Sequence, residues 1–212
     1  MQVGIVGYPG SGKSTVFTAL SEGAPQAEKG GVAFGNIKVP DARVLQLAEL
    51  FQPKKTLFAE VTFLDVGGGG RADTGAFSPA VLQHMRTADV LVHVARGFEN
   101  PLLARPADPA RDERLFGEEL VLLDQQIIER RQQRLAKEQK KGLEMEVNAR
   151  CLAQLEEGLP LRGLELNDEE RATLSGIQLL SLRPLITLYS LSEEAWEAGA
   201  FAELRQPTRR GP

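Results

Sequence analysis

Cysteine, histidine and long apolar runs are scarce in this chain of 212 residues. A single cysteine, Cys151, excludes an internal disulfide and gives no reason to expect an oxidising compartment. The two histidines form no ligand cluster with it, so a transition-metal site is not expected. No apolar run approaches the roughly 18 residues of a membrane helix, and the N-terminus has no signal-peptide pattern. These absences favour a cytoplasmic protein that does not cross a membrane.

Neither positive nor negative charge dominates the sequence. The formal net charge is -4, so the surface as a whole does not indicate nucleic-acid binding, which would need a local basic patch. Hydrophobic residues make up 42% of the chain and charged residues 25%, which is typical of a soluble globular protein. The length fits one domain, or one domain with a sizeable insertion.

A phosphate-binding motif is present close to the N-terminus. The segment 7–14 fits G-x-x-x-x-G-K-[ST] without a mismatch. Glycines allow successive backbone N–H groups to turn toward phosphate oxygens, and the lysine reaches the β- and γ-phosphates. A chance match is the alternative, but an apolar strand pattern precedes the motif and a helical pattern follows it. The candidate nucleotide-binding residues here are Gly7, Tyr8, Pro9, Gly10, Ser11, Gly12, Lys13, Ser14 and Thr15, with Lys13 as the catalytic candidate.

A carboxylate that suits the same site follows a second apolar run. Residues 61–65 read Val-Thr-Phe-Leu-Asp, and Asp65 at the end of this strand pattern is expected to hold Mg²⁺ together with the Ser14 hydroxyl. Gly68 completes a D-x-x-G spacing, where a backbone N–H can sense the γ-phosphate. The alternative is that Asp65 only begins a turn before four glycines.

Several segments together resemble one family. They are "GYPGSGKST", "IKVPDARVLQLAELFQPKK", "VTFLDVGGG", "ADVLVHVARGFENP", "LEEGLPLRGLELNDEE" and "LLSLRPLITLYSLSEE". The chain resembles the YchF / Obg-like ATPases from Gly4 to about Glu194. The resemblance implies a Ras-like α/β domain with an inserted helical hairpin, Mg²⁺-dependent hydrolysis with ATP preferred over GTP, and association with ribosomes. The family continues into a β-rich TGS domain, so we expect a truncated member with altered motifs.

Two of the altered motifs concern the γ-phosphate. The segment 23–40, where the family carries a Mg²⁺-binding threonine, has no Ser or Thr. After Gly68, where Ras-type enzymes place a water-orienting glutamine, the chain has Gly69. Arg71 nearby is a candidate cation for the site, although a solvated loop arginine is the simpler interpretation.

The base-reading motif is altered as well. Where the family has Asn-x-x-Glu, the chain has Ser190-Leu-Ser-Glu193, so Ser190 and Glu193 are the candidates for contact with the base. Guanine specificity has no visible support, and adenine is favoured by resemblance alone. A second interpretation makes Ser192 a helix N-cap followed by acidic residues that complement the helix dipole, and both can hold together.

The fold class expected from these patterns is α/β, a Ras-like P-loop sheet with helices on both faces and an inserted α-helical hairpin. Strands are predicted at 2–6, 35–39, 57–66, 89–95 and 185–189, the second and third antiparallel at one edge, and helices at 14–21, 41–51 and 79–87. The nucleotide-binding domain would comprise 1–111 and 178–204, the helical insertion 112–177, and a disordered tail 205–212.

The insertion reads as a hairpin because apolar residues recur every four positions, with Cys151 as a small residue of its seam. Its tip is predicted to carry a basic group that could grip RNA or the ribosome, or simply be solvated. That group is Arg130, Arg131, Arg134, Lys137, Lys140 and Lys141.

Three functions are compatible with these patterns. The first is a slow hydrolase of ATP or GTP with Mg²⁺, acting as a ribosome-associated switch. The second is a degenerate module that binds nucleotide, or nothing, and serves as an RNA or protein scaffold. A small-molecule kinase is the third, and the order of the motifs together with the absence of an Arg-rich lid argues against it.

Overall fold

The structure is a computed structural model. It describes residues 1–21, 27–29, 32–66, 77–103 and 105–199. The expected tail and the residues Gly68, Gly69 and Arg71 lie outside the described residues.

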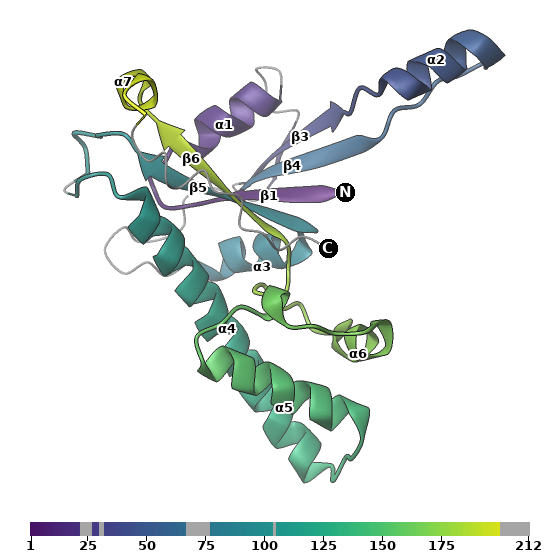
Figure 1. Cartoon of the computed structure of the whole chain (residues 1–212), viewed down its shortest axis with the longest axis vertical. Coiled ribbons are helices and arrows are strands. Elements are labelled where there is room, and N and C mark those ends of the chain that lie inside the picture. Colours follow the sequence, from purple (N-terminus) through teal and green to yellow (C-terminus); the bar gives the residue numbers. More distant parts are fainter. Residues whose placement is uncertain (22–26, 30–31, 67–76, 104, 200–212) are drawn as a thin grey trace.

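A six-stranded sheet in the order β2-β3-β4-β1-β5-β6 organises the molecule (Figure 1). The strands are β1 (Gln2–Val6), β2 (Ala27–Lys29), β3 (Val32–Lys38), β4 (Glu60–Val66), β5 (Val90–Gly97) and β6 (Leu185–Leu191). The strands β4, β1, β5 and β6 run parallel, and β3 runs antiparallel to both β2 and β4. The predicted antiparallel pair is therefore confirmed, but β2, which was not predicted, forms the edge of the sheet.

Helices cover both faces of this sheet, as predicted. The helices are α1 (Lys13–Leu20), α2 (Ala42–Phe51), α3 (Pro79–Thr87), α4 (Pro109–Lys137), α5 (Leu143–Glu156), α6 (Asp168–Leu174) and α7 (Glu193–Glu197), with a 3-10 turn at Leu161–Gly163. Neighbouring residues of a strand point to opposite faces. Accordingly Ile5 packs with Phe17 of α1 on one face, whereas Val6 packs with Met85 of α3 and Phe116 of α4 on the other.

The long helix α4 joins the sheet to the hairpin. Its 29 residues span about 43 Å at 1.5 Å per residue. Phe116 and Leu120 near its start belong to the core under the sheet, whereas Ile128 packs with Val147 and Cys151 of α5 in a second core. The predicted helical hairpin and the place of Cys151 in its seam are confirmed.

The returning chain is tied to the middle of α4 by one buried carboxylate. Asp124 is fully buried and accepts the backbone N–H groups of Leu180 and Ser181 at 2.9 and 2.6 Å. Burial raises the pKa of Asp124, and the bonds from Ser181 and Leu180 act in the opposite direction. These bonds satisfy two backbone N–H groups at the point where the chain leaves the hairpin and continues to β6.

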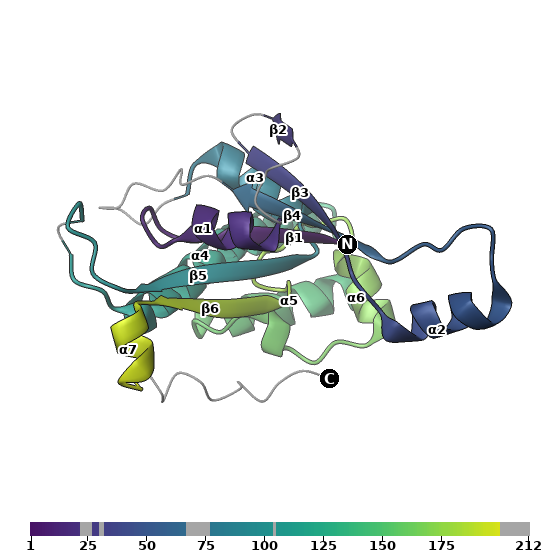
Figure 2. The same cartoon turned by 90° about the horizontal axis from the view of Figure 1, so that it is seen from above.

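Helix α2 stands apart from the rest of the molecule on an arm that continues β3 and β4 (Figures 1 and 2). None of its residues is buried, and Leu50 and Phe51 are 73% and 72% exposed. Asp41 caps its first turn by accepting the N–H of Arg43 at 2.8 Å. No helix among the described residues is both long and apolar enough to cross a membrane.

Candidate functional site

The phosphate-binding motif forms the turn between β1 and α1. Because β1 runs parallel to β4, β5 and β6, the carboxyl ends of four strands meet at this edge of the sheet. Ligands of parallel α/β sheets bind at that edge. The loop therefore lies where strand-end residues such as Asp65 and Ser190 come together.

Two glycines of the loop leave no room for a side chain. A Cβ on Gly7 would lie 2.5 Å from the carbonyl oxygen of Val94. Gly12 has a φ of +95°, and its Cβ would lie 2.9 Å from the Oγ of Ser190. The loop thus requires glycine both for its backbone conformation and for its close approach to β5 and β6.

Lys13 is folded over the loop that contains it. Its side chain is buried, and Nζ donates a hydrogen bond of 3.0 Å to the carbonyl oxygen of Tyr8. Burial lowers the pKa of the Lys13 ammonium, and the nearby Asp65 carboxylate acts in the opposite direction. The loop also holds itself through the N–H of Ser11, which donates to the same Tyr8 oxygen at 3.2 Å.

Asp65 lies at the end of β4, paired in register with Ile5 of β1. It is buried, and its Oδ1 has no hydrogen-bond partner among the described residues. Ser14 is exposed in the first turn of α1. A buried carboxylate oxygen without a donor and a serine hydroxyl in the first turn of α1 are oxygen ligands of the kind that Mg²⁺ prefers.

A cleft of about 640 Å³ opens beside Gly12 of the loop. Its lining includes Gly12, Thr15, Phe98, Ser190, Ser192 and Glu194. Glu193 is exposed in the first turn of α7 and is not among the lining residues. Ser192 caps α7, since its Oγ accepts the N–H of Ala195 at 3.2 Å. The capping prediction is confirmed, and of the two base-contact candidates the cleft contains Ser190.

A cluster of aromatic rings packs against the phosphate loop through Tyr8, and the sequence did not predict this cluster. His93 of β5 is fully buried, with its ring 4.2 Å from and parallel to that of Phe116. Tyr8 of the loop meets His93 edge-on at 6.2 Å and stacks on Phe77 at 6.0 Å. Burial and the nearby Lys13 charge lower the pKa of His93 to about 3, so this imidazole is neutral.

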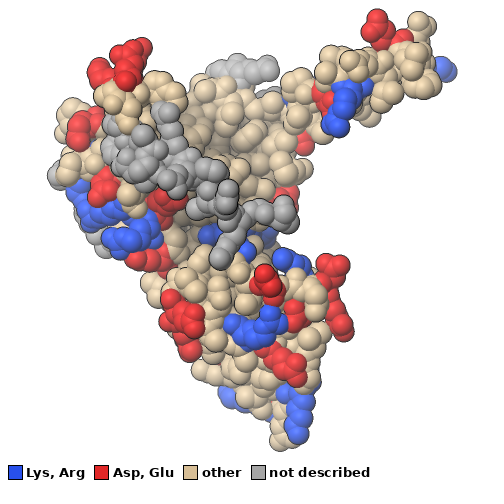
Figure 3. Space-filling view, viewed as in Figure 1, with Lys and Arg blue, Asp and Glu red and all other residues tan. Residues whose placement is uncertain are grey.

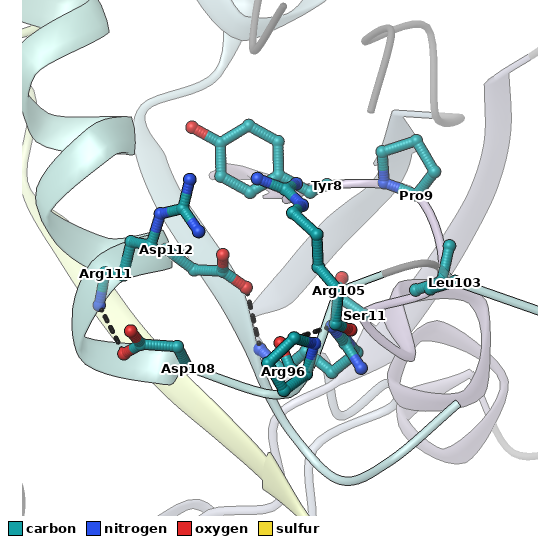
Figure 4. A pocket seen from close by; sticks show the side chains of 10 residues that line it. Tyr8, Pro9, Ser11, Arg96, Leu103, Arg105, Asp108, Arg111 and Asp112 are labelled. Atoms are coloured by element: carbon teal, nitrogen blue, oxygen red, sulfur yellow. Dashed lines mark hydrogen bonds between the residues drawn. The ribbon is translucent and has the colours of Figure 1, made fainter. Parts of the chain in front are cut away.

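A second, smaller cavity of about 60 Å³ adjoins the loop on the side of α4 (Figure 4). Tyr8 and Pro9 of the loop line it together with Arg96, Arg105 and Asp112. Burial raises the pKa of Asp112, and the hydrogen bond from the Arg96 N–H and the charges of Arg96 and Arg105 act in the opposite direction. This cavity brings a cluster of arginines to the phosphate loop.

The basic group of the hairpin differs from the prediction at Arg131. That side chain is only 7% exposed and pairs with Glu144 at 2.7 Å. It also donates to the Thr173 carbonyl at 2.9 Å and to Asn148 at 3.4 Å, so it holds α4, α5 and α6 together rather than facing a partner. Arg134 and Lys140 have acidic neighbours at 3.9 and 3.3 Å. The other three, Arg130, Lys137 and Lys141, are exposed as Arg134 and Lys140 are, near the end of the hairpin where Figure 3 shows basic side chains.

Comparison with known proteins places this chain in a family. The family model described as "50S ribosome-binding GTPase" matches residues 2–141. Ribosome-binding ATPase YchF of Escherichia coli O157:H7 is 32% identical over 94% of this chain, and Obg-like ATPase 1 of Oryza sativa subsp. indica is 30% identical over 93%.

A solved structure agrees with these relatives. The YchF GTPase of Schizosaccharomyces pombe matches 92% of this chain with a TM-score of 0.75 and 27% identity. The chain spans 59% of the Escherichia coli relative, 54% of the rice relative and 58% of the fission-yeast structure. The predicted resemblance is confirmed: the chain belongs to the 50S ribosome-binding GTPase family and is a relative of the YchF and Obg-like ATPases.

Proposed function

We propose that this chain binds a nucleoside triphosphate with Mg²⁺ and hydrolyses it slowly, acting as a cytoplasmic, ribosome-associated switch. One observation carries the proposal: a glycine-dependent loop, a buried lysine and a buried carboxylate oxygen without a donor meet at one edge of the sheet. The nucleotide-binding domain is proposed to comprise residues 1–111 and 178–204, and the helical insertion 112–177.

The chain's own residues would act by positioning and charge. Backbone N–H groups of the loop bind phosphate oxygens, and the Lys13 ammonium exchanges its bond to Tyr8 for the β- and γ-phosphates. Ser14 and Asp65 would hold the Mg²⁺ ion, which neutralises charge on the phosphates when bound. The N–H of Gly68 is proposed to contact the γ-phosphate.

The base is proposed to occupy the cleft beside Gly12. Phe98 offers an aromatic surface to any purine, and Ser190 offers one hydroxyl. Glu193 stands at the position of the carboxylate that reads guanine in GTPases, but it does not line this cleft, so ATP is proposed over GTP on the family resemblance alone. Glu193 is proposed to contribute through its charge rather than by contact, because it does not line the cleft.

Nucleotide titration tests the proposal. ATP, GTP, ADP and GDP are titrated with and without Mg²⁺ by calorimetry, followed by measurement of phosphate release. Lys13→Ala should weaken triphosphate binding about 100-fold, because charge-assisted bonds to phosphate are lost. Lys54→Ala, which removes an exposed lysine from the arm, is the matched control. Equal affinity of Lys13→Ala and the unaltered protein would contradict the proposal.

A second candidate function is a module that binds nucleotide without turnover. The sequence of the segment 23–40, which lacks any Ser or Thr, favours it because one expected Mg²⁺ ligand is missing. Tight diphosphate binding with no phosphate release over hours would select this function. Turnover that disappears in Lys13→Ala selects the first.

We further propose that ribosomal RNA is contacted through the basic end of the hairpin. Arg130, Lys137 and Lys141 are exposed there, whereas the likewise exposed Arg134 and Lys140 each have an acidic neighbour. Replacing all three by glutamine should reduce co-sedimentation with ribosomes and make it less sensitive to salt. A variant with Lys54 and Lys55 replaced on the arm is the control. Unchanged sedimentation of the triple variant would remove the hairpin from the interface.

A further inference from the structure

One buried arginine fixes the loop that connects β5 to α4. Arg96 is only 6% exposed, and its guanidinium donates to the carbonyl oxygens of Phe98, Arg105 and Pro106 at 3.1, 2.7 and 2.9 Å. The two bonds to Arg105 and Pro106 hold the backbone next to the small cavity. A side chain carried by this part of the loop is therefore held at a defined distance from the phosphate loop.

That side chain is Arg105. It runs along the cavity wall, and its guanidinium lies beside the ring of Tyr8, with Pro9 on the same side of the phosphate loop (Figure 4). Asp112, in the first turn of α4, is close enough to interact with the Arg105 charge. A guanidinium has five donors, so it can remain near one carboxylate while it donates to a second anion.

The phosphate loop offers one main-chain donor fewer at this corner. Pro9 has no N–H, so it contributes no main-chain donor to a bound anion. Phosphoryl transfer spreads negative charge over the terminal phosphate oxygens, and an arginine supplied by the same chain stabilises that charge in some GTPases. The chain has Gly69 where Ras-type enzymes have a glutamine, which leaves this charge without a polar side chain from that position.

We propose that Arg105 contacts the terminal phosphate of the bound triphosphate, and that Arg96 is the residue that positions it. The proposal rests on the proposed function, since it concerns the same nucleotide. It assigns the loop between β5 and α4 a direct role in distinguishing triphosphate from diphosphate.

The test compares triphosphate and diphosphate affinities of the full chain. Arg105→Ala and Arg105→Lys are titrated with ATP and with ADP in the presence of Mg²⁺, and phosphate release is followed under single-turnover conditions. Arg114→Ala is the matched control, because Arg114 is an exposed arginine of α4 that pairs with Glu118. Far-UV circular dichroism and thermal unfolding of each variant confirm that the fold is retained.

We expect Arg105→Ala to lose about tenfold or more in ATP affinity with ADP affinity unchanged, and to release phosphate more slowly. Arg105→Lys should recover only part of the ATP affinity, because lysine keeps the positive charge but lacks the planar guanidinium that donates two parallel hydrogen bonds. Arg96→Ala should lower the ATP to ADP affinity ratio in the same direction, whereas a merely structural role would lower both affinities together.

An unchanged ATP to ADP affinity ratio in Arg105→Ala would overturn this assignment, and the proposed function would stand if Lys13→Ala still lost both nucleotides. If the unaltered chain bound neither nucleotide, the proposed function and the role of Arg105 would both be refuted.

Discussion

The buried imidazole of His93 makes the stability of this protein depend on pH in a defined direction. The folded chain holds His93 neutral, with a pKa of about 3, because burial and the Lys13 charge oppose protonation. Neither ring nitrogen has a hydrogen-bond partner within the described ranges, so no contact there stabilises the imidazolium. In the unfolded chain the same group titrates near pH 6.5.

The sign and size follow from proton linkage. Between pH 6.5 and pH 3 the unfolded chain binds a proton that the folded chain does not, so stability falls as the pH drops through this window. His93 contributes its full stabilisation above pH 6.5. Lowering the pH from 7 to 5 should cost about 2 kcal/mol from this one group, since each pKa unit corresponds to about 1.4 kcal/mol.

Urea unfolding at pH 7 and at pH 5 measures this term. His93→Leu removes the titrating group from the unfolded chain, so its loss of stability between the two pH values should be about 2 kcal/mol smaller than that of the unaltered protein. Met85→Leu, in the same core, is the control, because it changes packing without changing titration. The reasoning is refuted if His93→Leu and the unaltered protein lose the same stability between pH 7 and pH 5.

Three further substitutions test other parts of the structure. Gly12→Ala should destabilise the fold by about 1–2 kcal/mol in thermal unfolding and weaken nucleotide binding, because the new Cβ meets Ser190 and the backbone is left-handed. Arg131→Met should cost about 2 kcal/mol in urea unfolding, because it removes the donor that Glu144, Asn148 and the Thr173 carbonyl share. Leu50→Ser should change the free energy of unfolding by less than about 0.5 kcal/mol, since this side chain is 73% exposed.

The phosphate loop and the strands around it could be predicted because their signals are local. The motif, the apolar strand before it and the helix after it lie within 20 residues, and β1 and α3 have the predicted bounds. The strand β2 could not be predicted, because its three residues carry no apolar alternation and pair only through β3. The cleft where we propose that the base binds is lined by Ser190, whereas Glu193, which follows on α7, does not line it.

The spacing of apolar residues around Arg131 indicates that its side chain is buried, although it lies within a run of basic residues. Ile128 and Leu135 lie three residues before it and four residues after it, and all three are buried on one side of α4. That spacing marks a position on the seam of the hairpin, where a charged side chain must find partners or remain unfavourable. Glu144 supplies the partner from α5. The predicted basic group was defined by position along the sequence alone. It therefore combined residues that lie on different sides of the helix.

Arg96 and Arg105 had no such signal, because no period links a strand end to an irregular loop. The contacts that matter there run from one guanidinium to three main-chain carbonyls, which the side-chain pattern of the sequence does not encode. At the carboxyl edge of the parallel sheet, the buried Arg96 restricts the loop beside the edge where ligands of such sheets bind. Arg105 is carried by the loop that Arg96 restricts, so its position beside the phosphate loop is apparent from the structure and not from the sequence.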